Sequence, residues 1–346
     1  MRIILLTGAS PPGACGVGDY TERLAQSLKS LGVDVRIVSV DRWRLADVAA
    51  ARKTLGKVRP DIVHLQYPTP GAGCRLGPQI LAVLRRSVVT VHEGSQAHFL
   101  RKLSLYPFTV RASHLVFTSE YERQFVTKLA PWIARISSVI PLGSNIRVAQ
   151  GGTARSHEEV VYFGLIMPTK GLEDVLQMAK LIRATGAGLR VRIVGKASPG
   201  HEAYFEQLRQ QSRGLPVIWE SNLEDEQVAT RLASCAVGYA PFPDGASERR
   251  ASLKAMLLNG VAVVSTCGAH TSTALRDVVR CSAGPQDALE AIRLLLDNPL
   301  ENRRLGQKGV EYMRQFAWDG IANLHLQMYE RVIRERVSDR RLLCAN

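Results

Sequence analysis

The 346-residue chain lacks the features that would direct it into or across a membrane. No apolar run approaches the roughly 20 residues that span a bilayer, and residues 1–6 are too short for the apolar core of a secretory signal. Its cysteines form no CxxC pair and have no metal-ligand spacing, so we expect most of them to be reduced, structural thiols rather than part of a disulfide framework or a zinc site. They are Cys15, Cys74, Cys235, Cys267, Cys281 and Cys344. These absences predict a cytoplasmic protein.

Motifs for three other chemistries are missing as well. There is no DxD motif, so we expect no metal ion and no cofactor at the site. The loop from Gly8 to Gly18 is too long and too interrupted by proline to be a compact GxGxxG turn, which disfavours a dehydrogenase. No helix-turn-helix or RNA-binding motif is present, and the aromatic residues are not interleaved with basic ones, so nucleic acid is not an expected partner.

Acidic residues are scarce in the first half of the chain. Residues 1–150 contain 20 Lys and Arg against 9 Asp and Glu, whereas the remainder contains 25 against 22. A basic half of this kind suits an anionic membrane surface, a negatively charged substrate or nucleic acid, and solvated charge without a function explains it equally well. It leaves open peripheral contact with the inner face of a membrane.

What the sequence does contain is an alternation of short β-rich runs with helical periodicity. This pattern predicts an α/β fold of two Rossmann-like, doubly wound domains that face each other across a cleft. We expect an N-terminal domain at 1–150, a second domain at 151–315 with a polar linker around Arg147 to His157, and a long amphipathic helix at 316–346 that belongs to the second domain or crosses back to the first. The predicted strands are 2–7, 34–40, 62–66, 87–92, 114–118, 137–141, 159–163, 190–194, 217–219, 237–240 and 261–265.

The most informative segment is FPDGASERRASLKAMLLNG, from Phe242 to Gly260. It places Glu248, Arg249 and Arg250 where a loop becomes a helix, with Ser247 as the expected N-cap. Unpaired N–H groups and the positive end of the helix dipole favour an anion at such a point, and guanidinium groups add charge-assisted bonds. The segment therefore predicts a diphosphate site at a carboxyl end of the sheet.

Other candidates have a structural reading beside the functional one. Lys170 stands at a strand-to-helix junction where it could reach phosphate oxygens, although a lysine there is often simply solvated. His92 ends a strand of the first domain and would face the cleft, or it is a satisfied core histidine. His64 and His114 lie within strands and are better structural candidates. The cluster at 224–226 is expected to cap a helix.

Eight segments of the sequence, taken in their order along the chain, resemble the retaining GT-B glycosyltransferases of family 4, which transfer a sugar from a nucleoside diphosphate donor. The resemblance spans nearly the whole chain and is specific for fold and donor class but not for the acceptor. The matching segments are CGVGDYTERLAQSL, VTVHE, FTSEYER, VIPLGSNI, VVYFGLIMPTKGLEDVL, RIVGKA, PFPDGASERRASLKAMLLNGVAVVSTCG and YMRQFAWDGIANLHLQMYERV.

Position by position, the resemblance implies that Gly16 and Gly18 lie against the donor phosphates. His92 lies beside the transferred sugar and orients it, and Glu248 contacts the sugar hydroxyls. These two are the expected catalytic residues. The donor is a UDP-, GDP- or other NDP-sugar.

The resemblance assigns the remaining donor contacts to the second domain. They come from Gly164, Lys170, Arg249, Arg250, Ser252 and Leu253. Fixed cations and N–H donors aimed at the leaving diphosphate lower the barrier without requiring a metal. From position alone, Gln66 and Tyr67 are expected to line the acceptor pocket.

Two positions depart from the family pattern. The place of a second glutamate aligns with Ala255, which puts the usual ribose contact in doubt, and Leu165 stands where an arginine commonly follows Gly164. Arg249 and Arg250 could replace that arginine. The prediction is a retaining glycosyltransferase of polysaccharide biosynthesis acting on a glycan, lipid-linked or small-molecule acceptor; the alternative is a non-catalytic sugar-nucleotide-binding subunit.

Overall fold

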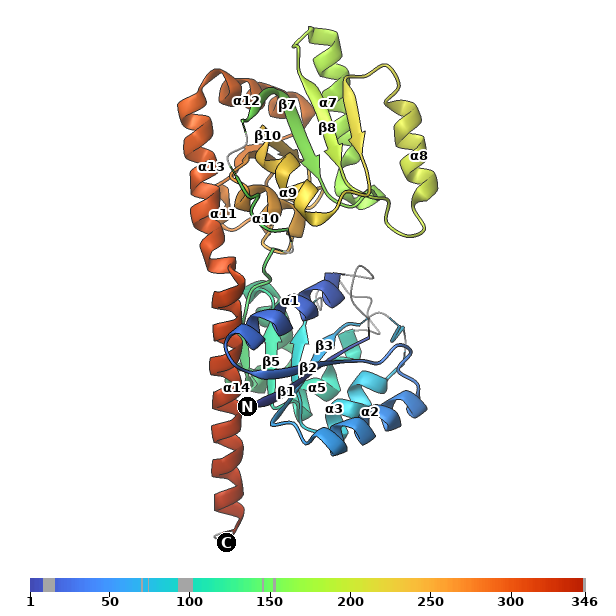
Figure 1. Ribbon diagram of the computed structural model, residues 1–346, viewed down its shortest axis with the longest axis vertical. Coiled ribbons are helices and arrows are strands. Elements are labelled where there is room, and N and C mark those ends of the chain that lie inside the picture. The colour runs from blue at the N-terminus through green and yellow to red at the C-terminus, as the bar shows by residue number, and fades with distance from the viewer. Residues whose placement is uncertain are drawn as a thin grey trace. The chain divides into compact units, whose positions relative to one another are not determined.

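The computed structural model describes residues 1–8, 16–69, 71–73, 75–92, 102–144, 146–151 and 154–344, with side chains as far as 338. The chain divides into two compact units (Figure 1). Unit 1 is Met1–Gly143 together with Phe316–Asn346, and unit 2 is Ser144–Gln315. The C-terminal helix therefore belongs to the same unit as the N-terminal strands.

Unit 1 contains a six-stranded parallel sheet in the order β2-β1-β3-β4-β5-β6. Its central strands are buried on both faces, which is why they read as continuous apolar runs. The strands are β1 (Arg2–Thr7), β2 (Asp34–Ser39), β3 (Ile62–Tyr67), β4 (Val88–Val91), β5 (His114–Phe117) and β6 (Ser137–Val139).

Alternate strand side chains of unit 1 enter two different helical layers, because successive residues of a strand point to opposite faces. Ile3 and Leu5 pack with helices on one face, and Ile4 and Leu6 pack with those on the other. The first layer is α1 (Gly16–Ser30) and α14 (Trp318–Cys344), and the second is α2 (Leu45–Val58), α3 (Gly77–Leu84), α5 (Tyr106–Arg111), α6 (Glu120–Leu129) and the short helix η1 (Pro131–Ile136).

Unit 2 repeats the architecture with a parallel sheet in the order β12-β11-β10-β7-β8-β9. The strands are β7 (Ser156–Phe163), β8 (Arg190–Val194), β9 (Val217–Glu220), β10 (Cys235–Ala240), β11 (Ala262–Thr266) and β12 (Arg280–Ser282). The helices are η2 (Pro168–Lys170), α7 (Leu172–Thr185), α8 (Glu202–Gln211), α9 (Asp225–Ala233), α10 (Ala251–Leu258), α11 (Thr273–Arg276), α12 (Pro285–Asp297) and α13 (Pro299–Met313); η3 (Arg314–Phe316) precedes α14. The predicted α/β fold with two doubly wound sheets is confirmed.

Two local expectations are confirmed, and one strand was missed. Glu224 caps α9, and the Gln227 side chain accepts from its backbone N–H at 3.0 Å, which forms a capping box. His64 is buried and bonded to Tyr329 and Thr90, as a structural histidine should be. The missed strand, β12, has only three residues and follows a polar loop, so its apolar signal is too short to recognise.

One pair of cysteines departs from the expectation that most are reduced and that no disulfide framework is present. Cys267 and Cys281 form a disulfide with their Cα atoms 5.5 Å apart, linking the loop after β11 to β12. Two adjacent parallel strands bring these residues together, and linear spacing does not show this. Cys235 is a buried free thiol, whereas Cys15 and Cys74 and the Cys344 side chain lie outside the described part of the structure. None of the helices described there combines the length and apolar character needed to cross a membrane.

Candidate functional site

Two glycines at the carboxyl ends of strands form the floor of a candidate site in unit 2. Gly164 follows β7 and Gly195 follows β8, and a Cβ at Gly195 would lie only 2.0 Å from the Gly164 carbonyl oxygen. A Cβ at Gly164 would lie 3.6 Å from the Ser252 Oγ at the start of α10. Only a residue without a side chain at position 195 allows the backbones of Gly164 and Gly195 to approach so closely, whereas the Ser252 side chain lies at an ordinary contact distance from position 164. We call the arrangement of Gly164, Gly195 and Ser252 the glycine cradle.

A third glycine fixes the junction that carries Lys170. Gly171 has φ +73°, and a Cβ there would lie 1.7 Å from the carbonyl oxygen of Pro241, just after β10. The Tyr162 hydroxyl donates to the Lys170 carbonyl at 3.3 Å. Burial raises the pKa of Tyr162, and the charge of Arg250 opposes that rise. Lys170 follows β7 and Arg250 follows β10, and these two strands are neighbours in the sheet. The structure thus gathers Lys170 and Arg250 at the same end of the sheet.

Helix α10 begins three residues later than the sequence suggested. Its N-cap is Arg250 rather than Ser247, and the Arg250 N–H donates to the Ser247 carbonyl at 3.0 Å in a preceding turn. The predicted Ser247 cap is therefore wrong. Serine ranks high as an N-cap residue and so predicts a helix start at 247, but residues 247–250 form a separate turn before the helix. The first helical residues, including Ser252 and Leu253, present their N–H groups beside the glycine cradle, as helix geometry requires.

Both arginines of the motif are held by one carboxylate. Asp244 pairs with Arg250, and an Arg249 Nη2 lies 3.9 Å from the other oxygen of Asp244. Arg250 also stacks with its guanidinium carbon 4.8 Å from the Phe242 ring centroid. These contacts restrict the rotamers of two cations ahead of the α10 N-terminus, which lowers the entropic cost of engaging an anion.

Glu248 points toward α13 and the start of α11. Its Oε1 accepts hydrogen bonds from Tyr312 at 3.0 Å and from Ser272. The sequence reasoning did not identify Tyr312 or Ser272, because both lie far from the motif along the chain. Because these hydrogen bonds fix the Glu248 carboxylate, it is suited to hold a bound group in one orientation.

Lys254 is a further charged residue that the sequence reasoning missed. Its side chain is 3% exposed, and burial lowers its pKa to about 7 despite the opposing charge of Glu248. A lysine two residues after Ser252 had a signal, because it lies within the apolar segment LKAMLL of α10, in which residues 253–257 are all buried.

In unit 1, the structure brings two of the predicted residues together. His92 Nε2 lies 2.9 Å from Gln66 Oε1, across the neighbouring ends of β3 and β4. Burial lowers the pKa of His92 to about 3, with the charge of His325 as a smaller cause, so the imidazole is neutral at physiological pH. Gln66 Nε2 is buried without a hydrogen-bond partner among the described residues, which leaves a donor beside His92.

Other predicted residues of unit 1 lie elsewhere. Tyr67 points to the opposite face of the sheet, where its hydroxyl bonds with Ser104 at 2.6 Å and accepts from Gln79 at 3.2 Å. Gly16 and Gly18 lie in the first turn of α1, so the helix already begins within the segment from Gly8 to Gly18 that the sequence predicts to be a loop. Gly13 and Glu93, which flank these candidates, are outside the described residues.

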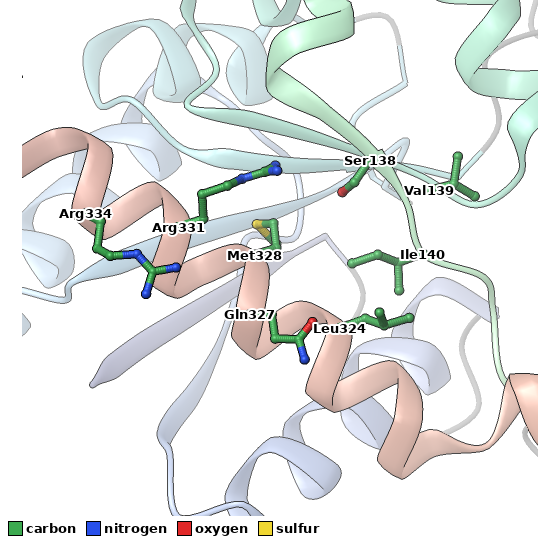
Figure 2. Close-up of a pocket in the computed structure, with 8 residues that line it drawn as sticks. All are labelled: Ser138, Val139, Ile140, Leu324, Gln327, Met328, Arg331 and Arg334. Carbon is green, nitrogen blue, oxygen red and sulfur yellow. The ribbon is translucent and has the colours of Figure 1, made fainter.

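A pocket of about 280 Å³ lies apart from all of these residues, between β6 and α14 of unit 1 (Figure 2). Leu324 and Met328 of α14 and Ile140 give it an apolar wall, and Arg331 and Arg334 stand along the helix beside it. None of the predicted site residues lines it.

No family model matches the chain, and no curated protein is similar to it in sequence. Solved structures, in contrast, match almost its whole length. HepE of Anabaena, in complex with UDP and glucose, has a TM-score of 0.70 at 14% identity and covers 96% of this chain and 100% of its own. Sucrose-phosphate synthase of Thermosynechococcus elongatus has a TM-score of 0.73 at 17% identity, with coverage of 97% and 100%. This chain has the GT-B fold.

A third similar structure is the catalytic domain of starch synthase IV of Arabidopsis thaliana bound to ADP and acarbose. It has a TM-score of 0.67 at 12% identity, and the alignment covers 96% of this chain and 99% of that one. At such identities the similarity establishes the fold, and the GT-B architecture predicted from the sequence is confirmed.

Proposed function

We propose that this protein is a glycosyltransferase that moves a sugar from a nucleoside diphosphate sugar to an acceptor, with retention of anomeric configuration. The observation that carries the proposal is the glycine cradle beside the α10 N-terminus, with Arg249 and Arg250 held at the same place. A diphosphate needs backbone N–H donors and fixed cations, and this end of the unit 2 sheet provides both.

The donor phosphates would lie on the cradle. In this proposal the Ser252 and Leu253 amides bind one phosphate, and Arg249, Arg250 and Lys170 balance the charge that develops as the diphosphate leaves. A ligand phosphate would share the two guanidinium groups with Asp244, whose carboxylate then keeps them oriented. Because positive charge is supplied by side chains, the proposal includes activity without a metal ion.

Glu248 of unit 2 and His92 of unit 1 are the residues proposed to bind the transferred sugar. Retention follows from attack on the same face: the bond from the anomeric carbon to the diphosphate oxygen breaks, the bond to the acceptor oxygen forms, and the acceptor proton passes to the departing phosphate oxygen. Neutral His92 can then act only as a hydrogen-bond partner of the sugar, oriented by Gln66. Glu248, fixed by Tyr312, would stabilise the sugar by hydrogen bonding in the transition state.

Unit 1 would bind the acceptor and unit 2 the donor. The basic character of unit 1 supports an anionic or lipid-linked acceptor, and the membership in family 4 suggested by the sequence motifs supports a role in polysaccharide synthesis. HepE was solved with UDP and starch synthase IV with ADP, which makes both nucleotides candidates for the donor. GDP and dTDP sugars complete the set to be tested.

The test is a thermal-unfolding panel of UDP-, GDP-, ADP- and dTDP-sugars, followed by product analysis with the donor that stabilises the protein. Transfer with retained anomeric configuration by NMR, undiminished by EDTA, is the expected result. Inversion would reject the same-face mechanism, and loss of activity with EDTA would reject metal independence.

A binding subunit without activity is the second candidate, and two positions favour it. Ala255 is fully buried in α10, so no carboxylate reaches the donor from that position, and Leu165 is 41% exposed where the family pattern has an arginine. This candidate predicts stabilisation by a donor sugar with neither transfer nor donor hydrolysis across an acceptor library. Stabilisation by no nucleotide sugar would overturn both candidates.

A further inference from the structure

Large apolar side chains gather on the outer surface of unit 1, where α5 adjoins η1 and the end of α6. The exposed fractions are 62% for Tyr106, 53% for Val110, 67% for Leu129 and 51% for Trp132. Single exposed apolar residues are common on soluble proteins, but a group of large ones on adjoining elements marks an interaction surface. We call these four residues the α5–η1 surface.

The four side chains form one continuous surface. Tyr106 and Val110 are four residues apart on α5 and so lie on the same side of that helix. The Tyr106 and Trp132 rings meet edge to face with centroids 6.4 Å apart, and the Trp132 indole N–H donates to the Thr109 carbonyl at 2.9 Å. Leu129 ends α6 three residues before Trp132. The surface lies in the helical layer opposite α1 and α14 (Figure 1).

Cations border the α5–η1 surface, and carboxylates are missing from it. Arg111 follows Val110, Lys128 precedes Leu129, and Arg135 lies one turn of the 3₁₀-helix after Trp132; all three are exposed. No ion pair of these cations is found within the described residues. Residues 102–119 and 123–157 contain no Asp or Glu at all. The positive charge at this surface is therefore not neutralised locally.

We propose that the α5–η1 surface docks the protein on an anionic lipid bilayer. Tyr and Trp combine an apolar ring with a polar group and prefer the headgroup region of a membrane, where Val110 and Leu129 would enter the acyl boundary. Lys and Arg at the edge attract anionic headgroups, and each contributes about fivefold to binding. The contact is peripheral, and it does not depend on the chemistry proposed for unit 2.

The charge pattern favours a bilayer over a protein partner. A specific protein interface pairs its charges with opposite charges and depletes lysine near its core. This surface instead has cations of one sign around a small aromatic centre, which suits a fluid layer of anionic headgroups.

The experiment is co-sedimentation of the full chain with vesicles of phosphatidylcholine alone and with about 30% phosphatidylglycerol added. We expect binding to the anionic vesicles at least about tenfold stronger than to the neutral ones, and a steep decrease as NaCl rises from about 50 to about 500 mM. Equal binding to the two vesicle types, or none to either, would overturn the proposal.

Substitutions assign the binding to this surface. Val110→Asp places a carboxylate at its centre while leaving the Trp132 bond to Thr109 intact, and Trp132→Ala removes the largest ring; each should lower anionic-vesicle binding by about tenfold or more. Leu294→Asp, at a 63% exposed leucine near the end of α12 in unit 2, is the matched control and should bind like the parent protein. Thermal unfolding confirms that each variant is folded.

Unchanged vesicle binding by folded Val110→Asp would overturn the assignment. So would a variant that changes only the self-association of the protein in size-exclusion chromatography, because the surface would then be a contact between two copies. Donor-induced thermal stabilisation, measured on the same variants, should stay at the parent value, so that failure of this proposal is distinguishable from failure of the proposed glycosyltransferase activity.

Discussion

Gly195 lies against the carbonyl oxygen of Gly164, so closely that a Cβ at Gly195 would come within 2.0 Å of it. The contact is between backbone atoms of two strand ends, and neither atom belongs to a flexible side chain that could move aside. It gives the site at the end of the unit 2 sheet a floor made of main chain.

Gly195→Ala should therefore disrupt the site. Relief of the clash requires movement of a strand end, which we expect to cost about 1–3 kcal/mol of stability and to abolish stabilisation by a nucleotide sugar. Gly56→Ala is the control, because a Cβ there meets nothing within 4 Å and alanine favours its helix. Differential scanning fluorimetry with and without donor measures both effects. A Gly195→Ala protein that binds donor normally would show that the cradle is not the phosphate site.

Arg250 should matter for the donor more than for the fold. A charge-assisted hydrogen bond contributes about 1.5–3 kcal/mol, so Arg250→Ala should weaken donor binding by about ten- to a hundredfold in isothermal titration calorimetry. Arg304→Ala removes an exposed arginine that also has a carboxylate partner, Glu301, and should leave binding unchanged. Equal affinities for both variants would contradict the assignment of the diphosphate to this turn.

Tyr312 should act through Glu248. Tyr312→Phe removes the 3.0 Å hydrogen bond to the Glu248 carboxylate and should lower kcat by about tenfold with KM nearly unchanged, because Glu248 is assigned to the transition state. Tyr204→Phe is matched to it, since Tyr204 donates at 2.6 Å to Glu173, a carboxylate with no role assigned in the reaction. Steady-state kinetics with the donor found in the panel separates the two. Identical kinetics for both variants would exclude a positioning role for Tyr312.

Buried histidines should make unit 1 sensitive to acid. Burial lowers the pKa values of these histidines below 6.5, the value in the unfolded chain. As the pH falls below 6.5, the unfolded chain binds more protons than the folded protein does, so stability is lost progressively until the pH reaches the pKa of the folded state. Each should cost about 2 kcal/mol between pH 7 and pH 5. The four residues are His64, His92, His114 and His325.

Urea unfolding at a series of pH values measures that loss. His114→Asn should reduce the slope of stability against pH by about one proton. A stability that is flat from pH 7 to pH 5 would mean that these imidazoles are charged or solvated in the folded protein.

The Cys267–Cys281 disulfide should stabilise unit 2. It closes a loop with a sequence separation of 14, and a loop of that size is expected to contribute about 3 kcal/mol through the unfolded state. Reduction by dithiothreitol should lower the unfolding midpoint of the parent protein but not of the Cys267→Ser/Cys281→Ser double variant. Intact-protein mass spectrometry of the purified chain, with and without reductant, shows whether the bond is present; a fully reduced parent protein would contradict it.

Many features of the fold could be predicted from the sequence. Strands buried on both faces have unbroken apolar runs, as at Ile62 and Val63, and the alternation with helical periodicity is characteristic of parallel sheets. The motif around Glu248 could be recognised as a strand-to-helix connection for the same reason. The start of helix α10 could not be predicted. Serine is a favoured N-cap residue and arginine is not, so the sequence points to Ser247, whereas the turn at 247–250 depends on contacts beyond the segment.

What the sequence by itself determined is the class of structure and the chemistry available: two α/β units, a pair of arginines before a helix, and a basic first half. Only the tertiary structure decided which groups meet, such as Gly164 with Gly195, Glu248 with Tyr312, and Cys267 with Cys281. Local periodicity depends on neighbours within one helix or strand. These contacts instead join residues from different elements, and which elements meet is set by the order of the strands in the sheet.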